Sequence, residues 1–156
     1  MKAFIDDIIC YISDCFKNDS DISKKVLVGD AYDDSAKVTP PHIFVQEIDD
    51  SEAIQYSSFD GESISYVPIQ ISAYCQQMKI GGATYTAKDA SAIFADKIKS
   101  MFQTLKVIKW NKNIKLMNRV GGTPSLPVQK GSTTYFSPIR YNFYVNYEYE
   151  KINKGE

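Results

Sequence analysis

The chain has 156 residues, of which 44% are hydrophobic and 24% are charged, with 18 basic side chains, 19 acidic ones and one histidine. This balance is typical of a folded globular protein and excludes disorder as the main state. A chain of this length buries about 68–70% of its unfolded surface, so it needs no disulfide or metal staple. We expect one domain over residues 1–150 and a short flexible tail at 151–156.

The net charge of −1 conceals two oppositely charged parts of the sequence. Residues 1–62 carry five basic and fourteen acidic side chains, whereas residues 63–156 carry thirteen basic and five acidic ones. Such a charge distribution can have no function, with all the charges simply solvated. It can also reflect nucleic-acid binding by the basic part, or two complementary surfaces through which one copy docks on the next. The basic run lacks the aromatic side chains that a single-strand binder uses for base stacking. It comprises Lys97, Lys99, Lys106, Lys109, Lys112, Lys115 and Arg119.

The first residues of the sequence predict a helix, and they lack the pattern of a signal peptide, so we expect a cytoplasmic protein. Apolar side chains recur at three- and four-residue steps over residues 3–16, with Asp6, Asp7 and Asp14 on the other face, which predicts an amphipathic helix. These aspartates interrupt what would be the apolar core of a signal peptide, and no stretch reaches the roughly 20 apolar residues that cross a bilayer. We therefore expect no membrane partner.

Short strands are predicted next, separated by polar loops. A strand is predicted at 25–28, an exposed loop at 31–41, and further strands at 42–48 and 65–76. Pro68 cannot donate a ladder hydrogen bond, so we expect that part of its strand to lie at an edge or a bulge. Between the two later strands, Asp60 and Gly61 form a hairpin-turn signal.

A second helix is predicted after the break at Gly81 and Gly82. Thr86, followed three residues later by Asp89, is typical of a helix N-terminus because both side chains can accept hydrogen bonds from free amides. One apolar stripe then predicts a helix that packs on a sheet. It comprises Ala90, Ile93, Phe94, Ile98, Met101, Phe102 and Leu105.

The last third of the chain predicts mainly strands. Two short strands are predicted at 106–110 and 113–120, a loop at 121–127, and a long strand in which every odd position from 139 to 149 is aliphatic or aromatic. The order of elements predicts an α+β domain. Its sheet is mostly antiparallel, with an N-terminal amphipathic helix and one central helix packed on it.

The sequence contains no convincing catalytic set. His42 directly follows two prolines and no GxSxG motif accompanies it, while Cys75 alternates with apolar residues and is predicted to be buried and inert. With Cys10 and Cys15 it completes three thiols without CxxC or Cys/His clustering, all expected to be buried or half-buried. Neither Gly–Gly pair continues into a phosphate-binding loop. We expect no catalytic, cofactor-binding or metal-ligating residues, and hence a binding or structural protein.

Five segments together resemble the small tail terminator and tail-completion proteins of tailed bacteriophages and phage-like particles. They are the helix AFIDDIICYISDCF with the strand PHIFVQEI, the strand YVPIQISAY, the helix TAKDASAIFADKIKSMF and the aromatic strand SPIRYNFYVNYEYE. The resemblance covers most of the chain. It implies a virion structural protein without enzymatic activity or cofactor, which caps the tail tube as a ring, usually of six subunits, and ends tube polymerisation.

The resemblance also implies partners and a location. The ring would contact its own copies, the tail tube protein, the head-side connector or neck protein and, where the tail is contractile, the sheath protein. It would assemble in the cytoplasm of the bacterial host and then occupy the neck end of the virion tail. Specific nucleic-acid binding is not expected.

Candidate interface residues come from this sequence rather than from the family. They are the acidic loop with Asp49, Asp50, Glu52 and Asp60, the basic run from Lys97 to Arg119, and the loop with Thr123, Pro124 and Leu126. Because a ring around passing DNA is expected to keep its channel acidic or neutral, we expect the basic run to face a neighbouring subunit or the tube.

Three other interpretations remain open at this point. One is a tail-completion or head-to-tail adaptor that stays monomeric until assembly. Another, from a different class, is a nucleic-acid-binding adaptor, whose affinity would fall linearly with salt on a log–log plot. An enzyme would be indicated by a deep pocket around His42 or Cys75 with shifted pKa values.

Overall fold

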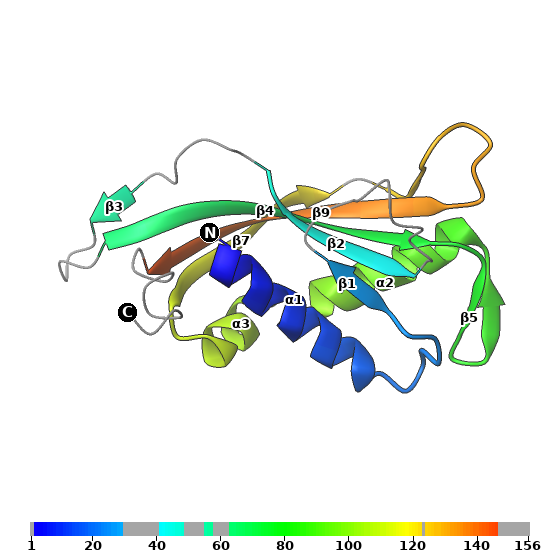
Figure 1. Ribbon diagram of the computed structural model, residues 1–156, viewed down its shortest axis with the longest axis horizontal. Helices are drawn as coiled ribbons and strands as arrows, with labels where there is room; N and C mark the ends of the chain where they lie inside the picture. The colour runs from blue at the N-terminus through cyan, green and yellow to red at the C-terminus, as the bar shows by residue number, and fades with distance from the viewer. Residues whose placement is uncertain (1, 30–40, 49–54, 58–62, 123, 147–156) are drawn as a thin grey trace.

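The computed structural model describes residues 2–29, 41–48, 55–57, 63–122 and 124–146, and these form two layers (Figure 1). One layer is a β-sheet, and the other consists of three helices that cover a single face of it. The predicted α+β class is therefore confirmed, with both the N-terminal and the central helix on the sheet. The helices are α1 (Lys2–Lys17), α2 (Ala87–Met101) and α3 (Thr104–Trp110).

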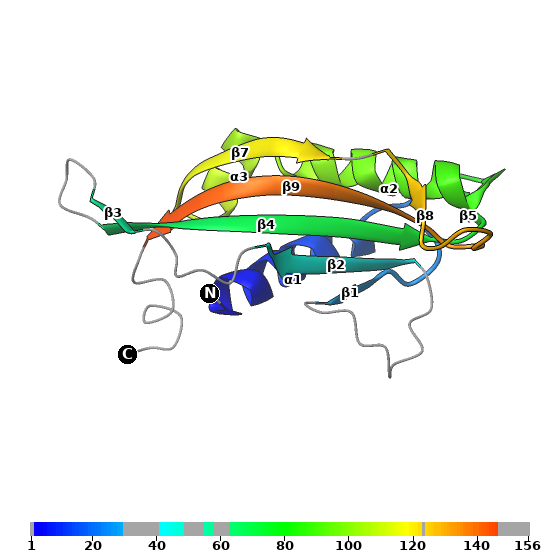
Figure 2. The ribbon, with the colours of Figure 1, turned by 90° about the horizontal axis from the view of Figure 1, so that it is seen from above.

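The sheet is almost entirely antiparallel. Its main strands lie in the order β1-β2-β4-β9-β7, with β3 paired to β4 and β8 paired to β9 (Figure 2). Among the described strands, only β1 and β2 pair in parallel. The strands are β1 (Leu27–Gly29), β2 (His42–Glu47), β3 (Gln55–Ser57), β4 (Ser63–Cys75), β5 (Met78–Ile80), β6 (Ala83–Tyr85), β7 (Ile114–Gly122), β8 (Leu126–Pro127) and β9 (Tyr135–Asn146).

The core lies between the helices and the inner face of the sheet. Alternate residues of β4 and β9 are buried, as the period-two pattern of both segments predicts. Phe4 of α1 packs edge-on against Phe143 of β9, with ring centroids 5.2 Å apart, and Phe16 stacks on Phe94 of α2 at the same separation. The two longer helices are thus attached to the sheet and to each other by aromatic contacts.

Pro68 lies in β4, which pairs with strands on both sides, yet its position satisfies the expectation of a local edge. Its carbonyl accepts a hydrogen bond from the Ile48 N–H, one residue beyond the end of β2. The carbonyl and the missing N–H of a strand residue point to the same side. The absent donor of Pro68 therefore faces Ile48, and the one bond that proline cannot make, to the Ile48 carbonyl, falls just beyond the end of β2.

The start of α2 confirms the predicted helix signal. Thr86 is extended, and its hydroxyl accepts a hydrogen bond from the Asp89 N–H at 3.3 Å. The Gly81–Gly82 break that precedes α2 is the turn of a hairpin formed by β5 and β6, which was not predicted from the sequence. Gly81 and Gly82 form its turn with φ angles of 60° and 84°, a conformation that glycine adopts without steric cost.

Three predictions for the region after α2 are wrong. Residues 106–110 form part of α3 rather than a strand, because the buried Val107 and the half-buried Ile108 and Trp110 all pack on the core from a helix. Leu105 does not continue the apolar stripe of α2 but is 84% exposed, since α2 ends at Met101 and α3 begins on a new axis. Part of the expected loop at 121–127 is strand, ending β7 and forming β8.

Other predictions are confirmed with shifted bounds or lie outside the described residues. The strands at 25–28 and 113–120 correspond to β1 and β7. The loop 31–40, the turn Asp60–Gly61, the end of the final strand from 147 and the tail 151–156 are outside the described part of the chain. The strands that flank Asp60–Gly61 do pair antiparallel, as a hairpin requires.

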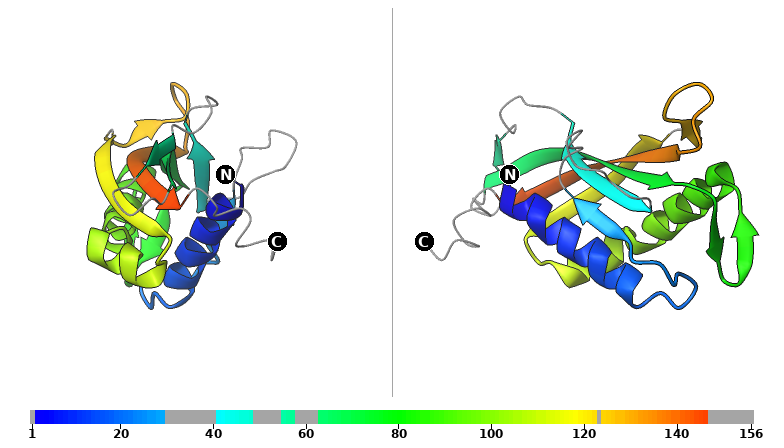
Figure 3. Two further views of the ribbon diagram at one scale, coloured as in Figure 1. Left: turned by 90° about the vertical axis from the view of Figure 1, so that its left-hand side faces the viewer. Right: turned by 45° about the vertical axis from the view of Figure 1, so that its right-hand side comes forward.

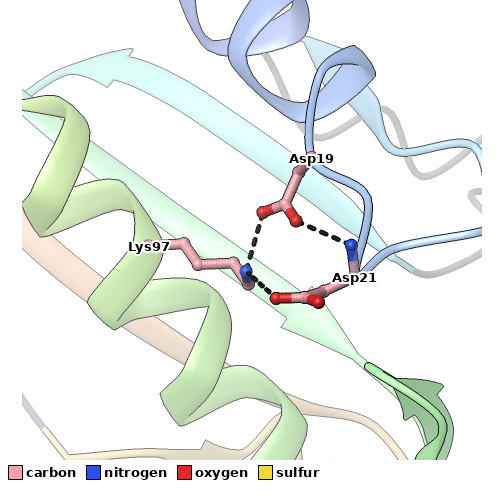
Figure 4. A network of polar contacts seen from close by, with 3 residues as sticks. All are labelled: Asp19, Asp21 and Lys97. Carbon is pink, nitrogen blue, oxygen red and sulfur yellow. Dashed lines mark hydrogen bonds and ion pairs between the residues drawn. The ribbon is translucent and has the colours of Figure 1, made fainter.

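A charged network joins the end of α1 to α2 (Figure 4). Lys97 Nζ lies 2.7 Å from an Asp19 carboxylate oxygen and 3.5 Å from one of Asp21, while the other Asp19 oxygen accepts the Asp21 N–H. Partial burial disfavours the charged forms of Asp19 and Lys97, but the hydrogen bonds and the ion pairs between these side chains favour the charged forms more strongly. The pKa of Asp19 is lowered and that of Lys97 is raised.

We predict that Lys97→Met lowers the free energy of unfolding by about 1–3 kcal/mol, because it leaves the partly buried carboxylate of Asp19, 19% exposed, without its cation. Urea denaturation of the variant and the wild type measures this. Lys99→Met on the same helix is the matched control, since Lys99 Nζ lies 3.7 Å from the exposed Asp96. Its effect should stay within about 0.5 kcal/mol. Equal losses in the two variants would contradict the structural role of the network.

Candidate functional site

His42 and Cys75, the two side chains that could have indicated an enzyme, point to opposite faces of the sheet, because His42 pairs with Tyr74, the neighbour of Cys75. Cys75 is fully buried at the end of β4, and burial raises the pKa of its thiol to about 12. His42 is half-buried at the start of β2 and stacks on Phe44, with ring centroids 4.1 Å apart. Neither lines any of the grooves described below. The prediction of buried or half-buried thiols is confirmed for Cys75 and Cys15 but is wrong for Cys10, which is exposed on the side of α1 that faces the end of α3.

Within the described ranges, no group of three or more His, Cys, Asp or Glu side chains is arranged to hold a metal ion. None of the helices in those ranges is both long and apolar enough to cross a membrane.

Three members of the basic run predicted as an interface have contacts within the chain. Lys97 points inward to the network with Asp19. Lys99 is paired with Asp96 on α2, and Lys106 donates a hydrogen bond to the Ser100 carbonyl at 3.0 Å. Lys97 is therefore a structural residue, which the sequence could not indicate because its partner lies 78 positions away.

The other four members of the run are exposed along one side of the molecule. We call them the basic edge: Lys109 on α3, Lys112 in the following turn, and Lys115 and Arg119 on β7. They lie together because α3 contacts β7 and β7 is the last strand on its side of the sheet. These residues thus follow the α3–β7 border, and Arg119 at its far end also lines a groove with Lys99 of α2.

Exposed apolar side chains are interleaved with the basic edge. Of the large hydrophobic residues exposed in the described ranges, most lie between α3 and the turn after β8: Leu105 (84% exposed), Leu116 (44%), Val120 (59%), Leu126 (44%) and Val128 (46%). Apolar side chains gathered on one side of a folded protein indicate contact with another apolar surface. Phosphates do not supply such a surface, so this mixture favours a protein partner over a nucleic acid.

The backbone of β7 is protected against pairing with another strand. Its pairing with β9 shifts register twice, between Ile114 and Leu116 and between Arg119 and Gly121. The Thr104 hydroxyl of α3 also donates to the Met117 carbonyl at 3.5 Å. Bulges, charged side chains and a covering helix are the usual devices that prevent edge-to-edge association. The basic edge is thus suited to contacts through side chains rather than to sheet extension.

A groove of about 390 Å³ lies between α2 and the ends of β7 and β9. Pro124 and Arg119 line it, together with Lys99 and Asp96 from α2. Of the predicted loop candidates, Pro124 lines this groove, Leu126 is exposed in β8 and Thr123 lies outside the described residues. Asp49, Asp50, Glu52 and Asp60, the acidic loop candidates, also lie outside them.

A second groove, of about 370 Å³, lies between α1 and α3 and was not predicted. Its lining consists of Asp7, Cys10, Tyr11, Asp14, Trp110 and Asn111. The sequence held a partial signal, because Asp7, Tyr11 and Asp14 are spaced to share one face of a helix. The contribution of Trp110 could not be foreseen, since residues 106–110 were predicted as a strand.

Comparisons with known proteins assign no family. A scan against protein-family models gave no match, and a search of curated proteins found no significant relative.

His42 makes the stability of the fold sensitive to mild acid. Burial lowers the pKa of its imidazole below the ordinary value of 6.5, and neither ring nitrogen has a hydrogen-bond partner in the described structure. The unfolded chain then binds a proton more readily than the folded one. The contribution of neutral His42 is present above about pH 6.5 and is lost as pH falls through the lowered pKa.

We predict that the wild type loses stability between about pH 7 and pH 5.5, and that His42→Phe loses less, because phenylalanine keeps the stacking on Phe44 without a protonatable group. Urea denaturation of both proteins at the two pH values measures the difference. Equal losses would show that His42 is not the responsible group.

Proposed function

We propose that the chain is a virion structural protein of the tail terminator type. In this function, copies assemble into a ring that caps the tail tube, ends its polymerisation and offers a joining surface to the head-side connector or neck protein. Assembly takes place in the cytoplasm of the bacterial host, after which the ring occupies the neck end of the tail. A sheath protein is a further partner where the tail is contractile.

One observation carries the proposal beyond the resemblance of the sequence. The side of the molecule formed by α3, β7 and β8 mixes the basic edge with exposed leucines and valines. A surface of this kind favours association with a protein that offers both apolar area and negative charge. The acidic first part of the same sequence can supply the charge. A second copy of the chain is therefore a suitable partner. When each copy uses one surface to bind a different surface of the next copy, the repeated rotation can close the copies into a ring.

A monomeric tail-completion or head-to-tail adaptor is the nearest alternative. Its surfaces would serve a different protein, so it would associate only in the presence of that template. The distinction lies in the oligomeric state of the isolated chain.

Nucleic-acid binding is the alternative from another class, and the outer face of the sheet gives it some support. This face, away from the helices, carries the aromatic pairs Tyr66–Tyr144 and Tyr74–Phe136, with ring centroids 5.5 and 5.3 Å apart. Arg140 lies on it too and donates to the Gln70 side-chain oxygen. Aromatic side chains beside a cation can stack bases. A single-stranded oligonucleotide whose binding weakens linearly on a log–log salt plot would favour this reading.

We predict that Leu105→Asp combined with Val120→Asp weakens self-association by at least about tenfold, because a carboxylate cannot be buried in an apolar contact without a large desolvation cost. Sedimentation velocity over a range of concentrations measures the effect. Leu27→Asp is the control, since Leu27 is 38% exposed on β1 at the other border of the sheet. Unchanged association of the double variant would remove the α3–β7 side from the proposed interface.

A further inference from the structure

The groove between α1 and α3 has the composition of a receptor for a cation. We call it the acidic–aromatic pocket, lined by Asp7, Cys10, Tyr11, Asp14, Trp110 and Asn111. Two carboxylates stand on the same side of α1, seven residues apart and therefore about two helical turns from each other. Two aromatic rings from different helices form part of the lining. Its acidity is thus combined with a hollow of defined shape.

The aromatic wall of the pocket is fixed by contacts within the chain. The Tyr11 hydroxyl donates a 2.8 Å hydrogen bond to the Met101 carbonyl at the end of α2. The Tyr11 ring stacks on Trp110, with centroids 4.4 Å apart and planes inclined by 25°, and meets Phe102 edge-on at 5.5 Å. A ligand would therefore not have to order these rings, which lowers the entropic cost of binding.

The chemistry of the lining selects a basic side chain. A cation near the face of tryptophan or tyrosine is attracted by the ring quadrupole, and flanking carboxylates add charge-assisted hydrogen bonds. Arginine meets both requirements with one planar group, and lysine meets them as a compact charge. The pocket thus fits a protein surface that presents Arg or Lys side chains.

The same chain presents such a surface elsewhere. The basic edge carries Lys115 and Arg119 on β7, which runs along the left-hand border of the molecule in the end-on view, with α1 to its right (Figure 3, left). The pocket adjoins the start of the basic edge, because its residues Trp110 and Asn111 lie just before β7 in the chain, whereas Arg119 lies farther along β7 beside the groove at α2. The acidic–aromatic pocket and the β7 part of the basic edge are two different, complementary surfaces, and a contact between two different surfaces is the head-to-tail arrangement that can close a ring.

We propose that the acidic–aromatic pocket of one copy receives Lys115 and Arg119 of the next copy. This contact rests on the proposed self-assembly and specifies which two surfaces meet. Oppositely charged surfaces set the orientation of the two copies, and the Trp110 and Tyr11 rings pack against the stems of the incoming side chains.

A charge-exchange experiment tests the contact. One variant combines Asp7→Lys with Asp14→Lys, and the other combines Lys115→Glu with Arg119→Glu. Each variant alone places like charges across the contact, so its self-association should weaken by at least about tenfold. An equimolar mixture restores opposite charges at every contact of an alternating assembly. We therefore expect the mixture to assemble as the wild type does, measured by native mass spectrometry and sedimentation velocity.

A matched mixture separates this contact from a general effect of charge. Lys24→Glu with Lys25→Glu changes the net charge by the same amount as the β7 variant, at two exposed residues before β1. Mixed with the Asp7→Lys, Asp14→Lys variant, it should not restore assembly. The pair Asp14→Lys and Arg119→Glu repeats the exchange with one substitution on each surface. It keeps the test valid if a double variant does not fold.

Trp110 provides a second readout, because it is the only tryptophan in the sequence. Insertion of a basic side chain excludes water from the half-buried indole. The emission of the wild type should therefore shift to shorter wavelength as the protein concentration is raised through assembly. The β7 variant alone should not show this shift.

The outcomes distinguish the contact from the proposed function. If the wild type assembles and both variants assemble equally well, this contact is wrong and the ring proposal stands. If the exchange mixture assembles no better than its matched control, the contact is also wrong. A wild type that associates neither alone nor at tail tubes overturns the contact together with the proposed function. A polyamine or an unrelated protein that fills the pocket without self-association would likewise overturn it.

Discussion

The antiparallel pairing of β4 with β9 is the constraint on which the remaining elements depend. It runs from Ile64 opposite Asn146 to Cys75 opposite Tyr135 without a register shift. A slip by one residue would turn the buried side chains of either strand to the outer face, so the apolar alternation fixes the register. The helices α1 and α2 then cover the inner face that this register creates, through contacts such as Phe4 on Phe143. On the other side of β9 lies β7, which carries part of the basic edge to the border of the molecule.

Local signals with a defined physical cause were sufficient to predict much of this fold. The Thr86 cap, the period-two pattern of β9 and the apolar face of α1 each appear in the structure as expected, because each signal lies within one element. Segment 106–110 was misassigned, since its three apolar residues are too few to show a period that separates a short helix from a strand. Tertiary packing decided that segment, with Val107 buried against the core.

The candidate surfaces were less accessible to sequence reasoning than the fold. Seven basic residues were treated as one run, but long-range partners divide them: Lys97 pairs with Asp19 across the helices, whereas Lys115 and Arg119 reach the border on β7. The exposure of Leu105 and the Tyr11–Trp110 stack both depend on the break between α2 and α3. Side chains before the break, on α2, are buried in the core, whereas Leu105, directly after it, is exposed and available to a partner. The break thus exposes Leu105 beside the basic edge and brings Trp110, at the end of α3, onto Tyr11 of α1 in the acidic–aromatic pocket.

Native mass spectrometry tests the proposed function most directly. The wild type is measured alone and mixed with tail tubes of the particle encoded by the same genome, and negative-stain images of the same samples are recorded. The account predicts a closed ring of a single subunit number, free in solution or bound only at tube ends. A protein that remains monomeric, ignores the tubes and binds oligonucleotides would contradict it. Such a protein would use the aromatic outer face of the sheet instead of the basic edge.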